Sequence, residues 1–278
     1  MKALAKAAAV TAALGLSVSA AEAGSKLMPG ISTGIHLGFP LPEGAYLISI
    51  PTYGSRDSDP RVDSFAAAPA WLIWSTPWEI AGGRLLFDTV MPFANVNIDN
   101  GPTLTGFANP ILDMQIKWDL GNNFYGGFQA GVYLPIKSDV GDDWASFQGI
   151  AALSYLTADW QLSTTLVYGT GRSGVDGGPA WFNADFTAIR KFGKFELGAV
   201  AFTSTDLSSP YAGYQKQSQF AAGGLIGYDF GAFSVQLKLT TDLYEDNYGG
   251  RDTRGWANIV VPFWSPKPSP AQQQLALE

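Results

Sequence analysis

The sequence has no cysteine and only one histidine among its 278 residues. Disulfide bonds and thiol chemistry are therefore excluded, and a dedicated transition-metal site is not expected. No interior segment approaches the ~20 apolar residues that a membrane-spanning helix requires. Basic residues are also scarce: 17 Lys and Arg stand against 24 Asp and Glu. The resulting net charge of -7 argues against a nucleic-acid partner, which would select a basic surface.

The apolar residues, 46% of the chain, are dispersed in a pattern that is clearest in Phe124–Lys137. Its even-numbered residues are apolar or glycine, whereas its odd-numbered residues carry phenol, amide and ammonium groups together with glycine and proline. Alternate side chains point to opposite faces of a strand, so this stretch predicts a β-strand with one apolar face. A helix would need apolar residues three and four positions apart. The strand is also long enough to cross a bilayer at a tilt, which takes ~9–11 residues.

The same period of two recurs along most of the chain and is interrupted by stretches rich in Gly, Asn, Asp and Ser, which favour turns. We therefore predict an all-β fold, namely a transmembrane antiparallel up-and-down β-barrel of about 12 strands. The barrel is expected over residues 44–264. The predicted strands are 46–53, 64–74, 84–97, 110–119, 124–137, 147–156, 160–168, 182–188, 195–205, 218–230, 233–243 and 254–264.

Two features favour this barrel over a soluble β-sandwich. The predicted connections alternate between short and long, as in outer-membrane barrels with short periplasmic turns and longer extracellular loops. The short connections follow Trp74, Leu120, Leu156, Arg190 and Phe230, and aromatic residues gather beside them, as expected of an aromatic belt at a membrane interface. A sandwich would not concentrate aromatic residues at one end of its strands. The belt residues are Trp74, Trp78, Trp118, Phe124, Trp160, Phe192, Phe195, Phe230, Phe233 and Phe263.

The two ends of the chain lack the strand pattern. Residues 1–23 have the features of a secretory signal peptide: Lys2 and Lys6 precede an apolar run, and Ala21-Glu22-Ala23 fits a cleavage site. Residues 24–43 contain three prolines and four glycines, and we predict an irregular segment, with a plug inside the barrel lumen as one interpretation. Residues 265–278 contain three prolines and three glutamines and are predicted to be a disordered tail.

The sequence offers little for catalysis. A Ser–His hydrolase on a barrel wall would need its histidine on a strand, but His36 precedes the first predicted strand. Gly169-Thr170-Gly171 lacks the Gly-Lys-Ser that follows in a phosphate-binding loop. The acidic residues of the long loops have no EF-hand spacing, so we interpret them as a solvated rim. We therefore predict a protein that is not an enzyme and has no cofactor or metal.

The polar faces of the predicted strands define a candidate lumen in which charges of both signs are interleaved. In one interpretation these charges pair across a filled lumen and stabilise it; in the other they form a polar constriction that solutes pass. Eight-stranded barrels are filled by side chains and 16–18-stranded barrels hold channels, so about 12 strands leave both interpretations open. The candidate lumen residues are Arg84, Asp88, Asp113, Lys117, Gln129, Tyr133, Asp185, Gln236, Lys238 and Asp242.

Five short stretches also resemble parts of a known family. They are Leu41–Tyr46, Trp74–Gly83, Met91–Phe93, Gly106–Pro110 and Val261–Phe263. Together they resemble the outer-membrane β-barrel family named for the meta-pathway of phenol degradation, and the Trp-x-x-Pro-Trp motif is the most specific piece. The resemblance implies a barrel that takes part in the uptake of aromatic or other hydrophobic compounds, and it supplies no catalytic or binding residues. The chain departs from the family pattern where Trp264 is followed by a fourteen-residue tail.

We therefore expect a channel in the outer membrane of a Gram-negative bacterium, for passive uptake of small aromatic or hydrophobic molecules. The alternative is a plugged structural or adhesive barrel that acts through its extracellular loops. A membrane-embedded hydrolase is a third hypothesis, which the single histidine disfavours. The expected partners are outer-membrane lipid and lipopolysaccharide, small apolar or aromatic solutes and the barrel assembly machinery, without nucleic acid.

Overall fold

The computed structural model describes residues 24–266, so the predicted signal peptide (1–23) and nearly all of the predicted tail lie outside the described residues. Across this range the chain forms fourteen strands in one antiparallel sheet and contains no helix that is long and apolar enough to span a membrane. The strands are β1 (Gly44–Arg56), β2 (Val62–Ile80), β3 (Gly83–Val90), β4 (Phe93–Ile98), β5 (Thr103–Phe107), β6 (Ile111–Gly121), β7 (Phe124–Tyr133), β8 (Ser146–Leu156), β9 (Trp160–Gly169), β10 (Trp181–Phe192), β11 (Phe195–Asp206), β12 (Ser218–Asp229), β13 (Ser234–Asp246) and β14 (Asp252–Trp264).

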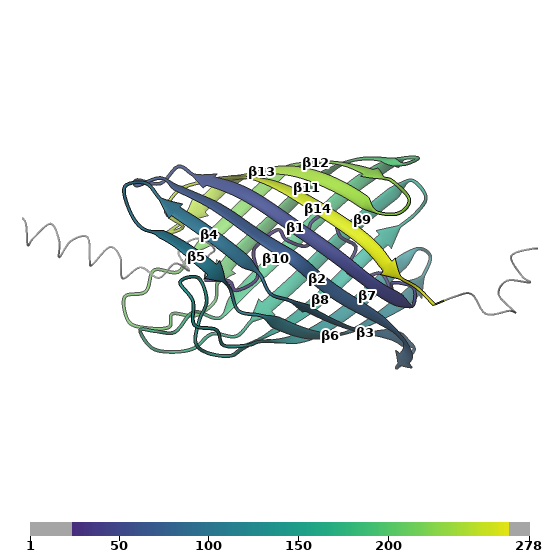
Figure 1. Cartoon of the computed structure of the whole chain (residues 1–278), viewed down its shortest axis with the longest axis horizontal. Coiled ribbons are helices and arrows are strands. Elements are labelled where there is room, and N and C mark those ends of the chain that lie inside the picture. Colours follow the sequence, from purple (N-terminus) through teal and green to yellow (C-terminus); the bar gives the residue numbers. More distant parts are fainter. Residues whose placement is uncertain (1–23, 267–278) are drawn as a thin grey trace, which may run out of the picture.

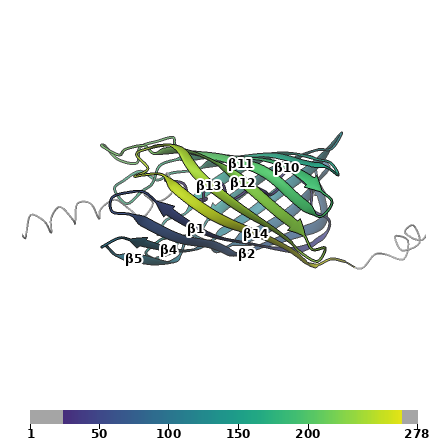
Figure 2. The ribbon, with the colours of Figure 1, turned by 90° about the horizontal axis from the view of Figure 1, so that it is seen from above.

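The sheet closes into a barrel because β1 pairs with β14 on one side and with β2 on the other. The ring then runs β14, β13 and so on down to β6, followed by β3 and β2, which makes twelve strands within the described residues. The remaining two strands, β4 and β5, form a hairpin that is attached to β2 at one end of the barrel (Figures 1 and 2). The predicted barrel class and the expected strand number are confirmed.

The connections differ in length between the two ends of the barrel. At the end that we call the turn end, β2 meets β3 through two residues, and β6–β7 and β10–β11 are joined equally tightly. At the opposite end, the loop end, β7–β8, β9–β10 and β11–β12 are separated by residues 134–145, 170–180 and 207–217. Nine of the ten predicted belt aromatics, all except Trp118, are exposed on the outer wall near the turn end. The outer wall thus has the apolar surface that lipid contact requires.

The structure differs from the prediction between residues 84 and 110. The alternation predicts one strand over 84–97, but the strand is broken at Met91-Pro92 into β3 and β4. Proline cannot donate a hydrogen bond to a sheet, so strand pairing changes partner there. β3 pairs with β6, whereas β4 pairs with β2 and β5. The stretch between the predicted strands 84–97 and 110–119 is expected to be a loop, and this is also wrong, because it contains β5.

The predicted end of the second strand at residue 74 is also wrong, because β2 continues to Ile80 and the chain turns at Ala81-Gly82. The pairing of β2 with β3 shifts register between Ser75 and Glu79, and the consecutive residues Ser75 and Thr76 are both buried. This irregularity interrupts the alternation and hides the end of the strand from the sequence pattern. β7, by contrast, ends at Tyr133 and not at Lys137.

Residues 24–43 run through the interior of the barrel from the loop end to the turn end (Figure 1). Gly24 lies beside Pro179 and Asp206 at the loop end. Further along, the Gly38 amide donates to Ser154 Oγ (3.2 Å), and the Leu41 carbonyl accepts from Ser75 Oγ (2.8 Å). Ile35 and Leu37 are buried against apolar side chains of the wall, so part of the hydrophobic core lies inside the lumen.

Candidate functional site in the barrel lumen

One polar cluster binds the backbone of the N-terminal segment at residues 30–34, and Asp185 of β10 lies at its centre. The Gly30 and Ser32 amides each donate to the Asp185 carboxylate at 3.0 Å, and the Ser32 hydroxyl donates at 2.7 Å. Two residues along the strand, Thr187 Oγ1 accepts from the Gly34 amide (2.8 Å). A buried carboxylate is costly unless it accepts several hydrogen bonds, and here backbone N–H groups supply them.

The opposite side of the same turn is held by β13 and β14. Lys238 Nζ donates to both the carbonyl and the hydroxyl oxygen of Thr33 at 2.8 Å, and it also lies 4.7 Å from the centroid of the Trp256 ring. Asn258 Nδ2 donates to the same Thr33 carbonyl (2.9 Å) and to Gln236 Oε1 (3.2 Å). The predicted lumen residues Asp185, Gln236 and Lys238 are thus brought together around the segment.

Gly34 permits this close approach. Its φ is +85°, and a Cβ atom would lie 2.3 Å from Gln236 Oε1 and 2.9 Å from Asn258 Nδ2. A side chain at this position would therefore clash with the wall and strain the backbone. On the far side, Gln161 Nε2 donates to the Gly34 carbonyl at 2.9 Å.

A second polar cluster lies on β2, β3, β6 and β8. Asp88 accepts hydrogen bonds from Trp71 Nε1 (2.7 Å) and from Gln115 Nε2. Asp113, directly opposite Asp88 in the sheet, accepts from Gln148 Nε2 at 3.3 Å. Lys117 is buried on the same face of β6, four residues after Asp113. The cluster therefore combines two carboxylates with one ammonium group.

The remaining predicted lumen residues occupy different positions. Tyr133 is buried and donates to Gln148 Oε1 (2.7 Å), whereas Gln129 is buried with its Nε2 lacking a hydrogen-bond partner. Arg84 lies near the turn end and donates to the Thr76 carbonyl (2.8 Å). Asp242 is buried and accepts from the Asp252 amide (2.9 Å). These positions belong to no shared cluster with Asp185.

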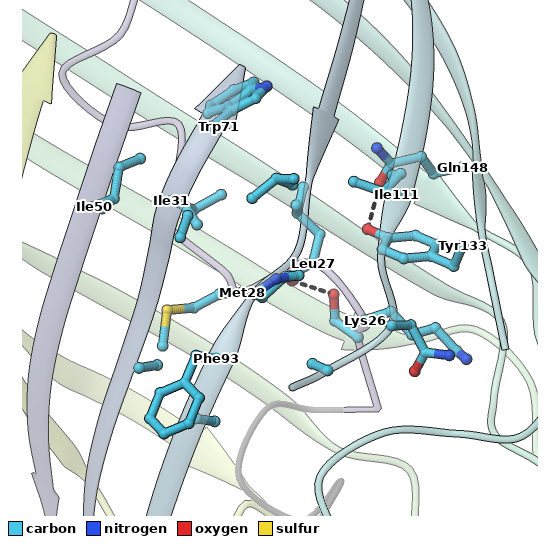
Figure 3. A pocket seen from close by; sticks show the side chains of 18 of the residues that line it. Lys26, Leu27, Met28, Ile31, Ile50, Trp71, Phe93, Ile111, Tyr133 and Gln148 are labelled. Atoms are coloured by element: carbon cyan, nitrogen blue, oxygen red, sulfur yellow. Dashed lines mark hydrogen bonds between the residues drawn. The ribbon is translucent and has the colours of Figure 1, made fainter. Parts of the chain in front are cut away.

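A cavity of about 390 Å³ lies between the two clusters and opens toward the loop end. Figure 3 shows Leu27, Met28 and Ile31 of the segment facing this space, between Ile50 and Trp71 on one side and Ile111 on the other. Its lining is mostly apolar, and the polar groups of Asp88, Asp113 and Gln148 lie at one side of it. Such a site, an apolar chamber with a few polar groups, is typical of pockets for small molecules.

The wall beside this cavity is closed by a loop instead of a strand. β5 pairs with β4 alone, and its other edge faces residues 134–145. Asn109 fastens this loop: its Nδ2 donates to the Leu134 and Asp142 carbonyls, both at 2.8 Å, and its Oδ1 accepts from the Asp142 amide at 2.9 Å. Ser138 Oγ adds a hydrogen bond to the Phe107 carbonyl (2.7 Å). Part of the cavity lining, including Asn109 and Asp142, comes from this region.

Several lumen residues outside the predicted set also contact the N-terminal segment or belong to the two clusters. Asn183 donates to Ser25 Oγ (2.9 Å) and to the Leu27 carbonyl (3.0 Å), and Trp71, Gln115, Gln148 and Asn258 complete the two clusters. All of them lie on the inward face of their strands, so strand parity was a signal that could have found them. Parity does not, however, reveal which distant residue each one contacts.

No group of three or more histidine, cysteine, aspartate and glutamate side chains that could hold a metal ion occurs within residues 24–266. His36 belongs to the N-terminal segment, and its ring packs edge-on against Phe39 with the ring centroids 5.5 Å apart.

The same fold occurs in a solved outer membrane channel, and two further solved structures are similar at lower TM-scores. The outer membrane channel COG4313 from Pseudomonas putida F1 superimposes with a TM-score of 0.67 at 14% identity, over 80% of this chain and 96% of that chain. The NanC porin gives 0.49 at 10% identity, over 77% and 98% of the two chains. The CymD monoaromatic hydrocarbon channel gives 0.47 at 7% identity, over 80% and 89%.

Among curated protein sequences no match is found. One family profile, however, matches residues 44–259, which is most of the chain and nearly the whole barrel. The resemblance drawn from the five short stretches is thereby confirmed. The chain belongs to the family described as "Putative MetA-pathway of phenol degradation".

Proposed function

We propose that this protein is an outer-membrane channel for small hydrophobic or aromatic molecules. The observation that carries the proposal is the cavity of about 390 Å³ enclosed between the barrel wall and the apolar side chains of the N-terminal segment. A molecule of one or two rings would fill such a space and bury most of its surface. The family and the fold shared with an outer membrane channel support the same assignment.

The polar side of the cavity adds a preference within that class. Asp88 and Asp113 present carboxylate oxygens there, and Gln148 presents an amide. A carboxylate accepts hydrogen bonds, so an aromatic solute with a hydroxyl group, such as a phenol, would be oriented with its hydroxyl toward these side chains. The apolar remainder would contact Ile50, Phe93 and the segment.

Within this proposal the N-terminal segment is a plug that restricts the lumen. It runs the length of the barrel and is held by Asp185, Lys238 and Asn258. The loop end would then face the cell exterior and the turn end would face the periplasm, as in other outer-membrane barrels. Free passage of large hydrophilic solutes is not expected through a barrel filled in this way.

Planar-bilayer recording with purified protein tests the proposal. Phenol added on the loop-end side should reduce the ionic current by occupying the cavity, while glucose at the same concentration should leave it unchanged. Ala66→Phe, which places a ring inside the cavity, should abolish the phenol effect. The matched control is Ala151→Phe, at an exposed position on the outer wall of β8, which should preserve it.

The alternative is a structural or adhesive barrel whose lumen is permanently filled, and the continuous contacts of the N-terminal segment favour it. The two functions separate in one comparison. If neither the wild type nor the double variant Asp185→Asn with Lys238→Gln carries a measurable current, the channel proposal is wrong and the structural one remains.

A further inference from the structure

Asp206, the last residue of β11, is a buried carboxylate at the loop end with one oxygen unsatisfied. The residue is 4% exposed. Its Oδ2 accepts from the Tyr214 hydroxyl (2.6 Å) and from the Gln217 amide (2.9 Å), whereas its Oδ1 has no hydrogen-bond partner. A charged oxygen that is buried without a partner costs free energy, so we expect Oδ1 to accept a hydrogen bond from a further donor.

The group beside this oxygen is the backbone of Gly24. A Cβ atom at Gly24 would lie 2.6 Å from Asp206 Oδ1 and 2.3 Å from Pro179 Cγ, and φ at Gly24 is +63°. Glycine is therefore required for the chain to lie this close to the carboxylate. Gly24 is also the residue that follows Ala21-Glu22-Ala23, the predicted signal-peptide cleavage site.

Nearby cations are already engaged elsewhere. Lys216 Nζ donates to the Leu207 carbonyl (2.8 Å), and Lys26 Nζ lies 2.8 Å from Asp142 Oδ2 and 3.7 Å from the centroid of the Trp144 ring. The Tyr214 hydroxyl remains a neutral donor, because burial and the adjacent Asp206 raise the pKa of Tyr214 far above its usual value. Neither lysine therefore donates a hydrogen bond to Asp206 Oδ1.

We propose that Asp206 is the binding site for the α-ammonium group of the mature chain, which cleavage after Ala23 creates at Gly24. Hydrolysis by an export signal peptidase adds water across the Ala23–Gly24 peptide bond. The hydroxyl goes to the Ala23 carbonyl carbon, and the nitrogen of Gly24 becomes an amine that is protonated at neutral pH. This ammonium group pairs with Asp206 Oδ1 and fixes the outer end of the N-terminal segment in the loop-end mouth.

The pairing makes seating of the segment depend on processing. Before cleavage, Gly24 N is a neutral amide and offers no charge to the carboxylate. After cleavage, a buried charged pair forms, with Tyr214 and Gln217 satisfying the other oxygen. The proposal concerns only where the segment is anchored, so it stands or fails independently of the solute that the barrel carries.

Amine labelling of the exported, refolded barrel tests it. Intact mass should first show that the mature chain begins at Gly24. A water-soluble acylating reagent at pH 7 should then label the α-amine at least ~10-fold more slowly in wild type than in Asp206→Asn, because an ion pair of about 1.4 kcal/mol suppresses the reactive free amine tenfold. Asp176→Asn, which changes an exposed acid at the same mouth, is the matched control and should behave as wild type.

A second variant covers the case in which Asp206→Asn does not fold. An alanine inserted between Ala23 and Gly24 adds one residue to the mature chain and moves the amine by up to ~3.5 Å. This variant should label at least ~10-fold faster than wild type. Where Asp206→Asn does fold, adding it to the extended chain should have no further effect. Equal labelling of wild type and the extended chain, or a mature chain that begins elsewhere than Gly24, would overturn the proposal.

Discussion

Asp88 and Asp113 are directly opposed on β3 and β6, and both carboxylates face the lumen. Like charges at directly opposed positions of neighbouring strands destabilise a sheet. The two carboxylates differ in the hydrogen bonds that offset this repulsion. Asp88 accepts from Trp71 Nε1 at 2.7 Å and from Gln115, whereas the contact from Gln148 Nε2 to Asp113 is long, at 3.3 Å.

This asymmetry predicts different costs for two equivalent substitutions. Asp113→Asn should leave stability unchanged within ~1 kcal/mol or raise it, since it removes a repulsion and loses a weak hydrogen bond. Asp88→Asn should lower the free energy of unfolding by ~1.5–3 kcal/mol, because it weakens hydrogen bonds to a charged acceptor. Urea unfolding in lipid vesicles measures both, and an equal loss in the two variants would contradict the asymmetry.

Asp185→Asn should release the N-terminal segment. The carboxylate accepts three hydrogen bonds from Gly30 and Ser32, and an amide would turn a donor toward them. We expect larger and noisier single-channel currents, with a lower unfolding midpoint. Asp229→Asn, at an exposed position beside the β12–β13 turn, is the control and should change neither quantity.

Lys238→Gln and Asp242→Asn should separate anchoring from wall stability. Lys238 holds Thr33 of the segment, whereas Asp242 accepts from the backbone of β14. Lys238→Gln is therefore expected to raise conductance and lower the unfolding midpoint, while Asp242→Asn should lower the midpoint alone. If the conductance of Lys238→Gln matched wild type, its hydrogen bonds to Thr33 would not restrict the lumen.

Neighbouring residues of β13 should respond oppositely to arginine. Leu237 is 51% exposed on the lipid-facing wall, and Leu237→Arg should cost ~2–4 kcal/mol near mid-bilayer. Gln236 faces inward and donates to Glu196 Oε2 at 2.8 Å, so an arginine there gains an acidic partner. Gln129 and Gln236 are buried within the filled lumen and do not lie in open water.

Refolding yield and unfolding in vesicles of matched lipid thickness would measure the difference between the two arginine variants. Leu237→Ala serves as the control, because it removes the leucine volume without adding charge. An arginine cost at Gln236 as large as that at Leu237 would mean that the inner face is too tightly packed for the exchange.

Asn109→Ala should free the loop that closes the wall beside β5. The substitution removes three hydrogen bonds: the Asp142 amide and the Leu134 carbonyl lose their Asn109 partner, and the Asp142 carbonyl keeps the bond from the Ile136 amide. Limited proteolysis at residues 134–145 should accelerate severalfold, with a loss of ~1–3 kcal/mol in stability. Asn95→Ala, whose amide donates to Thr105 Oγ1 on the exposed hairpin, should leave cleavage of this loop unchanged.

Most of the barrel follows from alternation alone. In β6, Asp113, Gln115 and Lys117 are buried while Leu112 and Met114 are exposed, as a period of two predicts. The prediction fails where the period and the pairing separate. Alternation continues across Met91-Pro92 although the pairing breaks there, and at Ser75-Thr76 the strand continues although alternation is lost.

Strand parity predicts which residues face the lumen, but not which residues they contact. Parity places Asp185 and Lys238 inside, yet their partners are Gly30, Ser32 and Thr33, more than 150 residues away in sequence. Residues 24–43 have no period, so nothing local assigns them a position. What holds them is a set of backbone amides and carbonyls, and every sequence supplies such groups equally.

The path of the N-terminal segment constrains the order of assembly. Its last residues join β1 at the turn end, while Gly24 lies at the loop end. The ring closes where β1 meets β14, the strand made last. Either the segment already lies across the open sheet when β1 pairs with β14, or it is threaded lengthwise through the closed barrel. Asp185 and Lys238, which bind the segment, lie on β10 and β13, so both strands are available before β1 pairs with β14. If the segment binds these strands first, it can act as a template around which the sheet closes.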